Sequence, residues 1–146
     1  SLVGSEMCIR DRAWPLPGAP ALVFEEDALM DRKKLLGREG EAEAARYLER
    51  KGYKILGLNY SCRYGEIDVI AEKGGYAAIV EVKLRESAEF AEAREFVTRA
   101  KQAKLRRVAL HWMMTSGTSL QPRFDVVEIY TGGREHIINH IENAFE

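Results

Sequence analysis

The chain has 146 residues, which is enough for one domain with a single hydrophobic core. Hydrophobic residues make up 46% and charged residues 31%, a balance typical of a globular protein, and no stretch approaches the roughly 18 consecutive apolar residues of a membrane-spanning helix. The two cysteines, Cys8 and Cys62, are too few for a disulfide framework and lack the partners of a zinc site. The composition therefore predicts a reducing, cytoplasmic compartment and no membrane partner.

The first residues differ in character from the rest of the chain. Residues 1–12 read SLVGSEMCIRDR, which looks like a translated sequencing adapter, and residues 13–29 hold three of the four prolines without a clear pattern. We predict that residues 1–12 are non-native, that residues 13–29 are irregular, and that residues 30–146 form the domain. The whole chain has a formal net charge of −1, but residues 30–146 hold 20 basic and 18 acidic residues, or about +2. A mildly basic domain is compatible with nucleic acid and does not require it.

In chain order, the first predicted element is a helix over residues 31–51, which are rich in Ala, Leu, Glu, Lys and Arg and are followed by Gly52. Residues 53–60 read as a strand, and residues 61–65 as the connection that follows it. Two further strands, residues 65–72 and 76–84, flank Gly74-Gly75, a pair typical of a two-residue hairpin turn.

The second half of the chain predicts a helix over residues 97–114, a strand over residues 123–130 and a short strand over residues 136–145. The order is helix, three strands, helix, then one or two strands. We expect a mixed α/β domain with one central mixed sheet.

One acidic residue of the first helix is expected to face the sheet. At about 100° per residue, Glu41 lies on the same face as Ala44, Ala45 and Leu48, whereas most other charged residues point away. A carboxylate on an apolar face is costly unless it is paired or binds a metal. Pairing with an arginine or water at the edge of the face explains Glu41 equally well.

The hairpin places more acidic residues together. Counting outward from the Gly74-Gly75 turn, Asp68 falls opposite Glu81, and Glu66 falls opposite Lys83. These four side chains are expected on one face, and their neighbours Ile67, Val69, Val80, Val82 and Leu84 on the other. Two opposite carboxylates, about 5 Å apart at Cβ, repel each other unless a cation lies between them.

These carboxylates predict a site for Mg²⁺ or Mn²⁺, because such hard cations prefer oxygen ligands. Asp68, Glu81 and Glu41 are the expected ligands, and Lys83 the group that orients a water or stabilises charge during phosphodiester hydrolysis. The alternative is a solvent-facing hairpin with a Glu66–Lys83 ion pair and a tolerated acidic pair.

Several stretches of the sequence, GREGEAEAARYLERKGYKIL, NYSCRYGEIDVIA, IVEVKLR, VTRAKQAKLRRVA, RFDVVEI and HIENAF, together resemble the YraN family of bacterial proteins. The resemblance covers about residues 36–145. It implies a restriction-endonuclease-like fold, similar to archaeal Holliday-junction resolvases, with Glu41, Asp68, Glu81 and Lys83 as catalytic residues and Glu66 in support. The family's usual Phe-Gly pair is replaced in this sequence by Phe90-Ala91.

The expected partner is nucleic acid, with DNA favoured, and the resemblance leaves a homodimer open. The predicted nucleic-acid contacts are Lys101, Lys104, Arg63 and Arg85. His136 and His140 lie four residues apart, but no acidic or cysteine partner for them is visible in the sequence. Three functions therefore stay open: a nuclease acting on DNA, including branched DNA, a non-catalytic nucleic-acid-binding module, and a protein-interaction domain.

Overall fold

The computed structural model describes the backbone of residues 25–86 and 97–146. It describes the side chains of Leu35 and of residues 37–86 and 97–146. The predictions for residues 1–24 and for Phe90-Ala91 lie outside the described residues. Leu35–Glu146 form one compact unit. No helix in the described part of the chain is long and apolar enough to cross a membrane.

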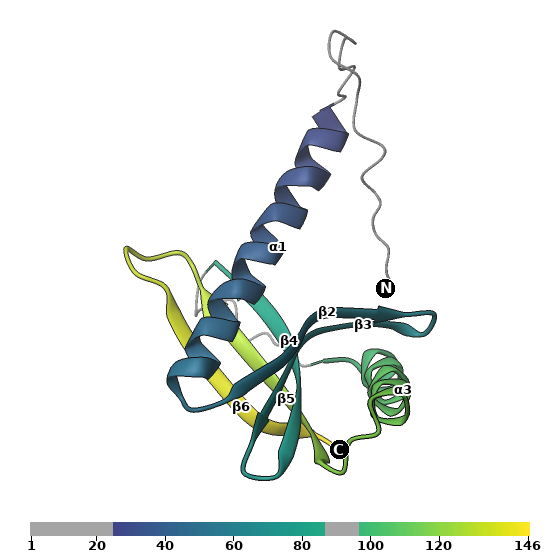
Figure 1. Ribbon diagram of the computed structural model, residues 1–146. Helices are drawn as coiled ribbons and strands as arrows, with labels where there is room; N and C mark the ends of the chain where they lie inside the picture. Colours follow the sequence, from purple (N-terminus) through teal and green to yellow (C-terminus); the bar gives the residue numbers. More distant parts are fainter. Residues whose placement is uncertain (1–24, 87–96) are drawn as a thin grey trace, which may run out of the picture. The chain divides into compact units, whose positions relative to one another are not determined.

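Within residues 25–86 and 97–146, five strands form one mixed sheet, and two helices pack against it (Figure 1). The strands lie in the order β2-β3-β4-β5-β6; β4 and β5 are parallel, and the other neighbouring pairs are antiparallel. This arrangement confirms the predicted mixed α/β class. The elements are α1 (Glu25–Arg50), β2 (Lys54–Cys62), β3 (Gly65–Lys73), β4 (Tyr76–Arg85), α3 (Arg99–Ser116), β5 (Gln121–Tyr130) and β6 (Ile137–Phe145).

The β3–β4 hairpin has the predicted turn and register. Gly74 and Gly75 both adopt positive φ, 61° and 84°, as a two-residue hairpin turn requires. Backbone pairing runs from Lys73 opposite Tyr76 to Val69 opposite Val80. Glycine is needed at this turn because other residues rarely adopt positive φ.

The pairing of β3 with β4 ends just before the acidic residues. Asp68 and Glu81 come next in the register, but Asp68 Oδ2 instead accepts a hydrogen bond from the backbone N–H of Val82 at 2.8 Å. The expected cross-strand pairs, Asp68 with Glu81 and Glu66 with Lys83, are therefore wrong as ladder pairs. The two strands separate where opposite carboxylates would repel each other.

The two faces of the sheet carry separate hydrophobic clusters. One cluster joins α1 to β3, β4 and β5, and the other joins α3 to the opposite face of the same strands. Because side chains alternate along a strand, each face takes every second residue. The α1 cluster contains Ala44, Leu48, Tyr53, Val69, Ala71, Ala78, Val80, Val127 and Ile129. The α3 cluster contains Ile67, Ile70, Ala77, Ile79, Val97, Leu105, Val108, Ala109, Trp112, Phe124 and Val126.

Ile67 was expected on the same face as Val69, and this prediction is wrong, because Ile67 packs with α3. The residues of β3 that precede Val69 no longer pair with β4 but still pair with β2. This two-stranded part of the sheet runs toward α3, as Figure 1 shows. Strand twist along this two-stranded extension carries Ile67 to the other side.

Except for the start of α1, every predicted element end lies within two residues of the observed end. Helix α1 begins at Glu25, six residues before Asp31, so residues 25–29 are helical and not irregular. The acidic residues at positions 25–27 favour a helix N-terminus, a signal that was overlooked. Strand β2 extends to Cys62, because Ser61 and Cys62 still pair with β3, and only Arg63 and Tyr64 form the turn.

Candidate active site

Helix α1 brings Glu41 to the point where β3 and β4 separate. Ala44, Ala45 and Leu48 anchor the helix on the sheet and are 0%, 6% and 0% exposed. Glu41 lies one turn earlier on this face, as the helical periodicity predicted. Its Oε1 atom is buried and has no hydrogen-bond partner.

The environment of Glu41 opposes its negative charge. Burial, a hydrogen bond with Asp68 that only a protonated carboxyl can make, and the charge of Asp68 raise the pKa of Glu41 from 4.5 to about 7. Asn59 donates a hydrogen bond that favours the charged form, and Glu66 adds further repulsion. Other groups of the protein therefore balance the negative charge of Glu41 only in part.

A glycine allows α1 to approach β4 closely beside Glu41. A Cβ atom added to Gly40 would lie 2.9 Å from Leu84 Cδ2, closer than Cβ atoms come to other heavy atoms. Gly40 is buried, and Leu84 is 40% exposed. The missing side chain at Gly40 thus leaves room for the Leu84 side chain at the turn of the helix that carries Glu41.

Glu81 is the second buried acid of the site, with 9% of its surface exposed. Burial raises the pKa of Glu81 above its ordinary value, and the charges of Asp68 and Glu66 raise it further. Lys101 and Lys83 oppose this shift, and Lys101 Nζ lies 3.9 Å from Glu81 Oε2. Helix α3 thus supplies the cation nearest to Glu81.

The charges around Glu41 and Glu81 do not balance. Four carboxylates face two ammonium groups, which leaves an excess of two negative charges when all are ionised. Within residues 25–86 and 97–146, however, no three Asp, Glu, His or Cys side chains are gathered closely enough to enclose an ion as they stand. The charged groups are Glu41, Glu66, Asp68, Glu81, Lys83 and Lys101.

The model of the Uncharacterised protein family UPF0102 matches residues 40–129. The chain belongs to this family. It is similar to a UPF0102 protein of Pelotomaculum thermopropionicum, with 42% identity over 80% of this chain and 100% of that protein. UPF0102 proteins of Caldanaerobacter subterraneus and Alkaliphilus metalliredigens are 43% and 44% identical over 77% of this chain, and over 96% and 98% of their own lengths. These matches confirm the resemblance to the YraN family and leave the superfamily relation a hypothesis.

The structure of this UPF0102 protein distributes the predicted nucleic-acid contacts over two regions. Lys101 lies beside Glu81, whereas Arg63 and Lys104 lie near the turn between β2 and β3. Arg85 Nε instead donates to Glu128 Oε2 at 2.8 Å, and side-chain exposures of 15% and 11% show that this pair is largely buried. The Arg85–Glu128 pair favours a structural role for Arg85.

The sequence analysis missed Asn59 of β2, whose side chain acts to lower the pKa of Glu41. Asn59 adopts φ 53°, and asparagine is one of the few residues that tolerate this region. An asparagine inside a strand-like stretch was the available signal, since asparagine is uncommon in strands.

The expectation that the two histidines lack acidic partners is also wrong. His136 Nδ1 lies 2.8 Å from Glu43 Oε1, and His140 Nε2 lies 2.8 Å from Asp125 Oδ2. Glu43 is 93 residues from its partner in sequence. Contacts between side chains of separate elements leave no periodic pattern in the sequence, so only the folded chain reveals them.

Proposed function

We propose that this UPF0102 protein is a metal-dependent nuclease that hydrolyses phosphodiester bonds in DNA, with branched DNA among its substrates and a restriction-endonuclease-like ancestry. The observation that carries the proposal is the buried, unpartnered Oε1 of Glu41 beside Asp68, where a second buried acid, Glu81, has a raised pKa. Carboxylates whose negative charge is not balanced by other groups of the protein are typical of functional sites.

The side chains present fit a hard divalent cation. Glu41, Asp68 and Glu81 offer only carboxylate oxygens, and these favour Mg²⁺ or Mn²⁺ over softer metals. Mg²⁺ in phosphoryl-transfer sites is commonly held by one or two carboxylates, with phosphate oxygens and water as the other ligands. A site without three closely gathered protein ligands is therefore compatible with Mg²⁺.

A bound cation would polarise the phosphoryl group and make a water molecule more acidic. Glu41 lies beside Asp68 and would help to hold the cation or a water molecule bound to it. Lys83 lies two residues beyond Glu81 on β4 and can stabilise negative charge that develops on the phosphate. Lys101 holds Glu81 and offers a further cation to the phosphate backbone.

The experiment combines calorimetric titration of Mg²⁺ and Mn²⁺ with cleavage assays on single-stranded, duplex, flapped and four-way DNA. The full chain is compared with the Asp68→Ala variant and with a matched control, Glu72→Ala, which removes another acid of β3 four residues away. We expect saturable cation binding and cleavage by wild type and by Glu72→Ala, and loss of both in Asp68→Ala.

Two results would contradict the nuclease proposal. One is equal cation binding by Asp68→Ala and Glu72→Ala, which would mean that these carboxylates hold no ion. The other is a folded wild-type protein that binds DNA but cleaves none of the four forms with either cation. That second result would favour the non-catalytic nucleic-acid-binding module.

A further inference from the structure

Helix α3 is strongly basic. Its 18 residues include five Lys and Arg and no Asp or Glu. Lys101, Lys104 and His111 follow one another at spacings of three and seven residues, so they share one face of the helix. The first of them lies beside Glu81 in the candidate active site. These three side chains form a basic stripe, which runs from the candidate active site along α3.

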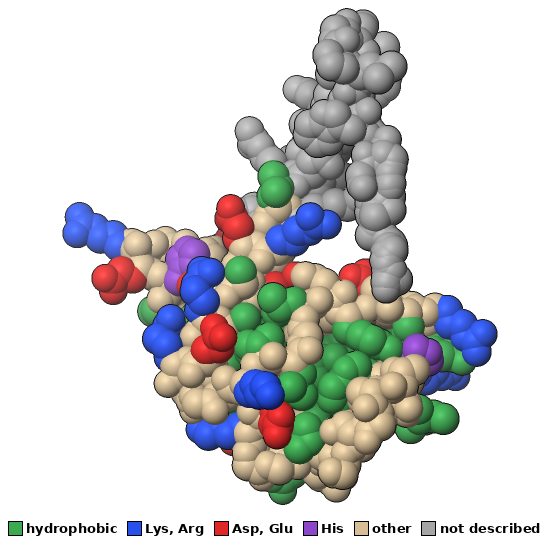
Figure 2. Space-filling view, in the orientation of Figure 1, with side chains coloured by type: hydrophobic (Ala, Val, Ile, Leu, Met, Phe, Trp, Pro, Cys, Tyr) green, Lys and Arg blue, Asp and Glu red, His purple; other side chains and the backbone are tan. Residues whose placement is uncertain are grey.

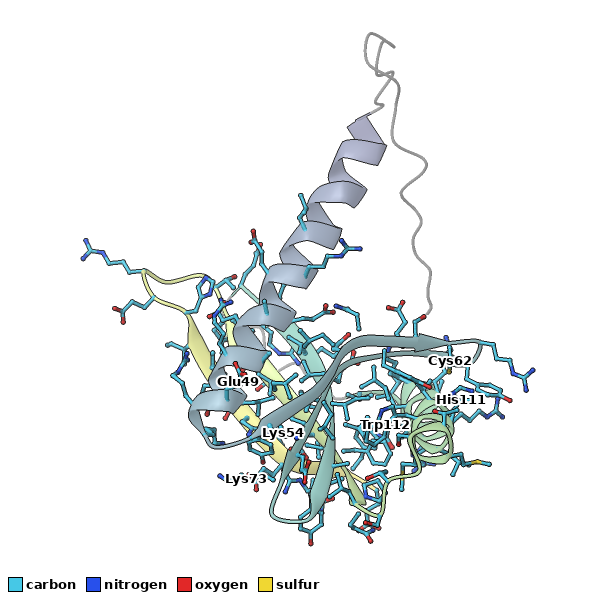
Figure 3. The ribbon with its side chains drawn as sticks, viewed as in Figure 1. Glu49, Lys54, Cys62, Lys73, His111 and Trp112 are labelled. Atoms are coloured by element: carbon cyan, nitrogen blue, oxygen red, sulfur yellow. The ribbon has the colours of Figure 1, made fainter. Side chains whose placement is uncertain are left out.

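The far end of this stripe meets the turn between β2 and β3. A Cβ atom added to Gly65 would lie 3.3 Å from Val108 Cγ2 and 3.9 Å from Lys104 Cδ, so the hairpin end packs closely on α3. Figure 3 labels Cys62 of β2 and His111 of α3 at this end of the molecule. Figure 2 shows Lys and Arg side chains and a histidine gathered at the same end.

Aromatic rings and a guanidinium group form a cluster at this contact. Tyr60 Oη lies 2.7 Å from His111 Nδ1, and the rings of Tyr64 and His111 meet edge to face at 6.0 Å. The guanidinium of Arg63 lies 4.9 Å from the centre of the Tyr64 ring and donates to its hydroxyl at 2.7 Å. Arg63 is exposed and Tyr64 is half-buried, so part of this cluster faces solvent.

We propose that this cluster binds an unpaired strand of nucleic acid, with a base stacked on Tyr64 and Arg63 and the phosphates along Lys104 and Lys101. Surfaces that bind single strands combine aromatic rings, on which bases stack, with a basic track for the backbone. The inference rests on the proposed nuclease function, and it specifies the substrate as DNA with unpaired nucleotides beside the cleaved bond.

The spacing between the cluster and the candidate active site fits this substrate. Tyr64 and Asp68 are four residues apart on the β2–β3 hairpin, or about 13 Å at roughly 3.3 Å per residue. A strand of a few nucleotides spans that distance. A base stacked at Tyr64 would therefore hold its own strand near Asp68.

The opposite end of the sheet provides a matched control. Tyr76 is 43% exposed, and the guanidinium of Arg123 lies 5.3 Å from its ring centre, much as Arg63 lies over Tyr64. Arg123, however, donates two hydrogen bonds to the buried carboxylate of Asp125. Its charge is therefore already neutralised, and we expect no strand to bind there.

The test measures binding without cleavage, using the full chain in EDTA. The probes are a dye-labelled 20-nucleotide single strand and a blunt duplex of the same sequence. We expect wild type to bind the single strand more tightly than the duplex. Tyr64→Ala should weaken single-strand binding about tenfold and leave duplex binding nearly unchanged. Tyr64→Phe keeps the ring and should bind like wild type, as should Tyr76→Ala.

A second measurement uses the wild-type protein alone, in case Tyr64→Ala does not fold. A single strand that contains 2-aminopurine should lose fluorescence when its base stacks in the complex. The inference is overturned if that fluorescence is unchanged in the bound strand, or if Tyr64→Ala weakens single-strand and duplex binding equally. Tyr64-dependent single-strand binding by a protein that cleaves nothing would support the inference and refute the nuclease. Cleavage without Tyr64-dependent binding would support the nuclease proposal and refute this inference.

Discussion

Two carboxylates, Asp125 on the sheet and Glu41 on the helix that packs against it, differ in how the protein balances their negative charge. Asp125 on β5 is 0% exposed, and it receives hydrogen bonds from Arg123, His140 and the backbone N–H of Asn143. Burial opposes its ionisation, but these bonds together outweigh burial and hold the pKa of Asp125 below its ordinary value. Glu41 is less buried, yet its pKa is raised to about 7.

The difference shows that burial does not by itself mark a functional carboxylate. The Asp125 cluster ties several elements together: Arg123 also donates to Tyr53 Oη at 2.6 Å, and Lys51 Nζ lies 2.9 Å from His140 Nδ1. It is complete without any ligand. The Glu41 cluster has an orphaned oxygen and surplus negative charge, and for this reason it is the better candidate for binding a cation.

The largest effect expected from this comparison is on Asp125. The Asp125→Ala substitution removes the buried carboxylate that pairs with Arg123 and with the 1%-exposed His140 side chain. We expect the free energy of unfolding to fall by about 3–5 kcal/mol, as when one partner of a buried ion pair is removed. Urea denaturation measures this change, and Asp68→Ala should cost much less, because it relieves repulsion. Equal losses in the two variants would refute the distinction between the clusters.

The next effect is a pH dependence caused by Glu41. The folded protein holds a proton on Glu41 between pH 4.5 and about 7, whereas the unfolded chain releases it, so the free energy of unfolding falls as pH rises through this window. Because Glu41 is only partly buried and water screens its charge, the loss should reach about 1–2 kcal/mol by pH 8. Glu41→Gln should reduce this slope in urea denaturation and leave the part that the raised pKa of Glu81 contributes, whereas Glu39→Gln, at an exposed position of the same helix, should keep the whole slope. Identical pH profiles for the two variants would exclude the raised pKa of Glu41.

The smallest effect concerns the position of Glu41. A methyl group at Gly40 meets Leu84, and the cost of this overpacking, about 1–3 kcal/mol, is partly offset by the roughly 1 kcal/mol that alanine adds in a helix; Gly40→Ala should therefore cost at most about 2 kcal/mol and weaken Mg²⁺ binding measured by calorimetry. Adding Leu84→Ala should restore Mg²⁺ affinity. The control is Gly37→Ala, where no atom lies within 4 Å of the added Cβ and about 1 kcal/mol of stabilisation is expected. Mg²⁺ affinity unchanged in Gly40→Ala would show that this glycine does not position Glu41.

The sequence alone determined what depends on neighbours along the chain. Helical periodicity placed Glu41 on the buried face of α1, and the Gly74-Gly75 turn fixed the register as far as Val69 opposite Val80. Both follow from local geometry, which repeats every 3.6 or every two residues. The family was likewise readable from short stretches of sequence.

Tertiary structure decided which distant groups meet. It separated the strands at Asp68, turned Ile67 toward α3, and paired His140 with Asp125. It also left Glu41 without a full set of partners. These outcomes depend on repulsion, twist and packing between elements far apart in the chain, and no periodic pattern records them. The sequence therefore predicted the acidic residues of the candidate site, but only the fold determined which of these carboxylates lack compensating partners.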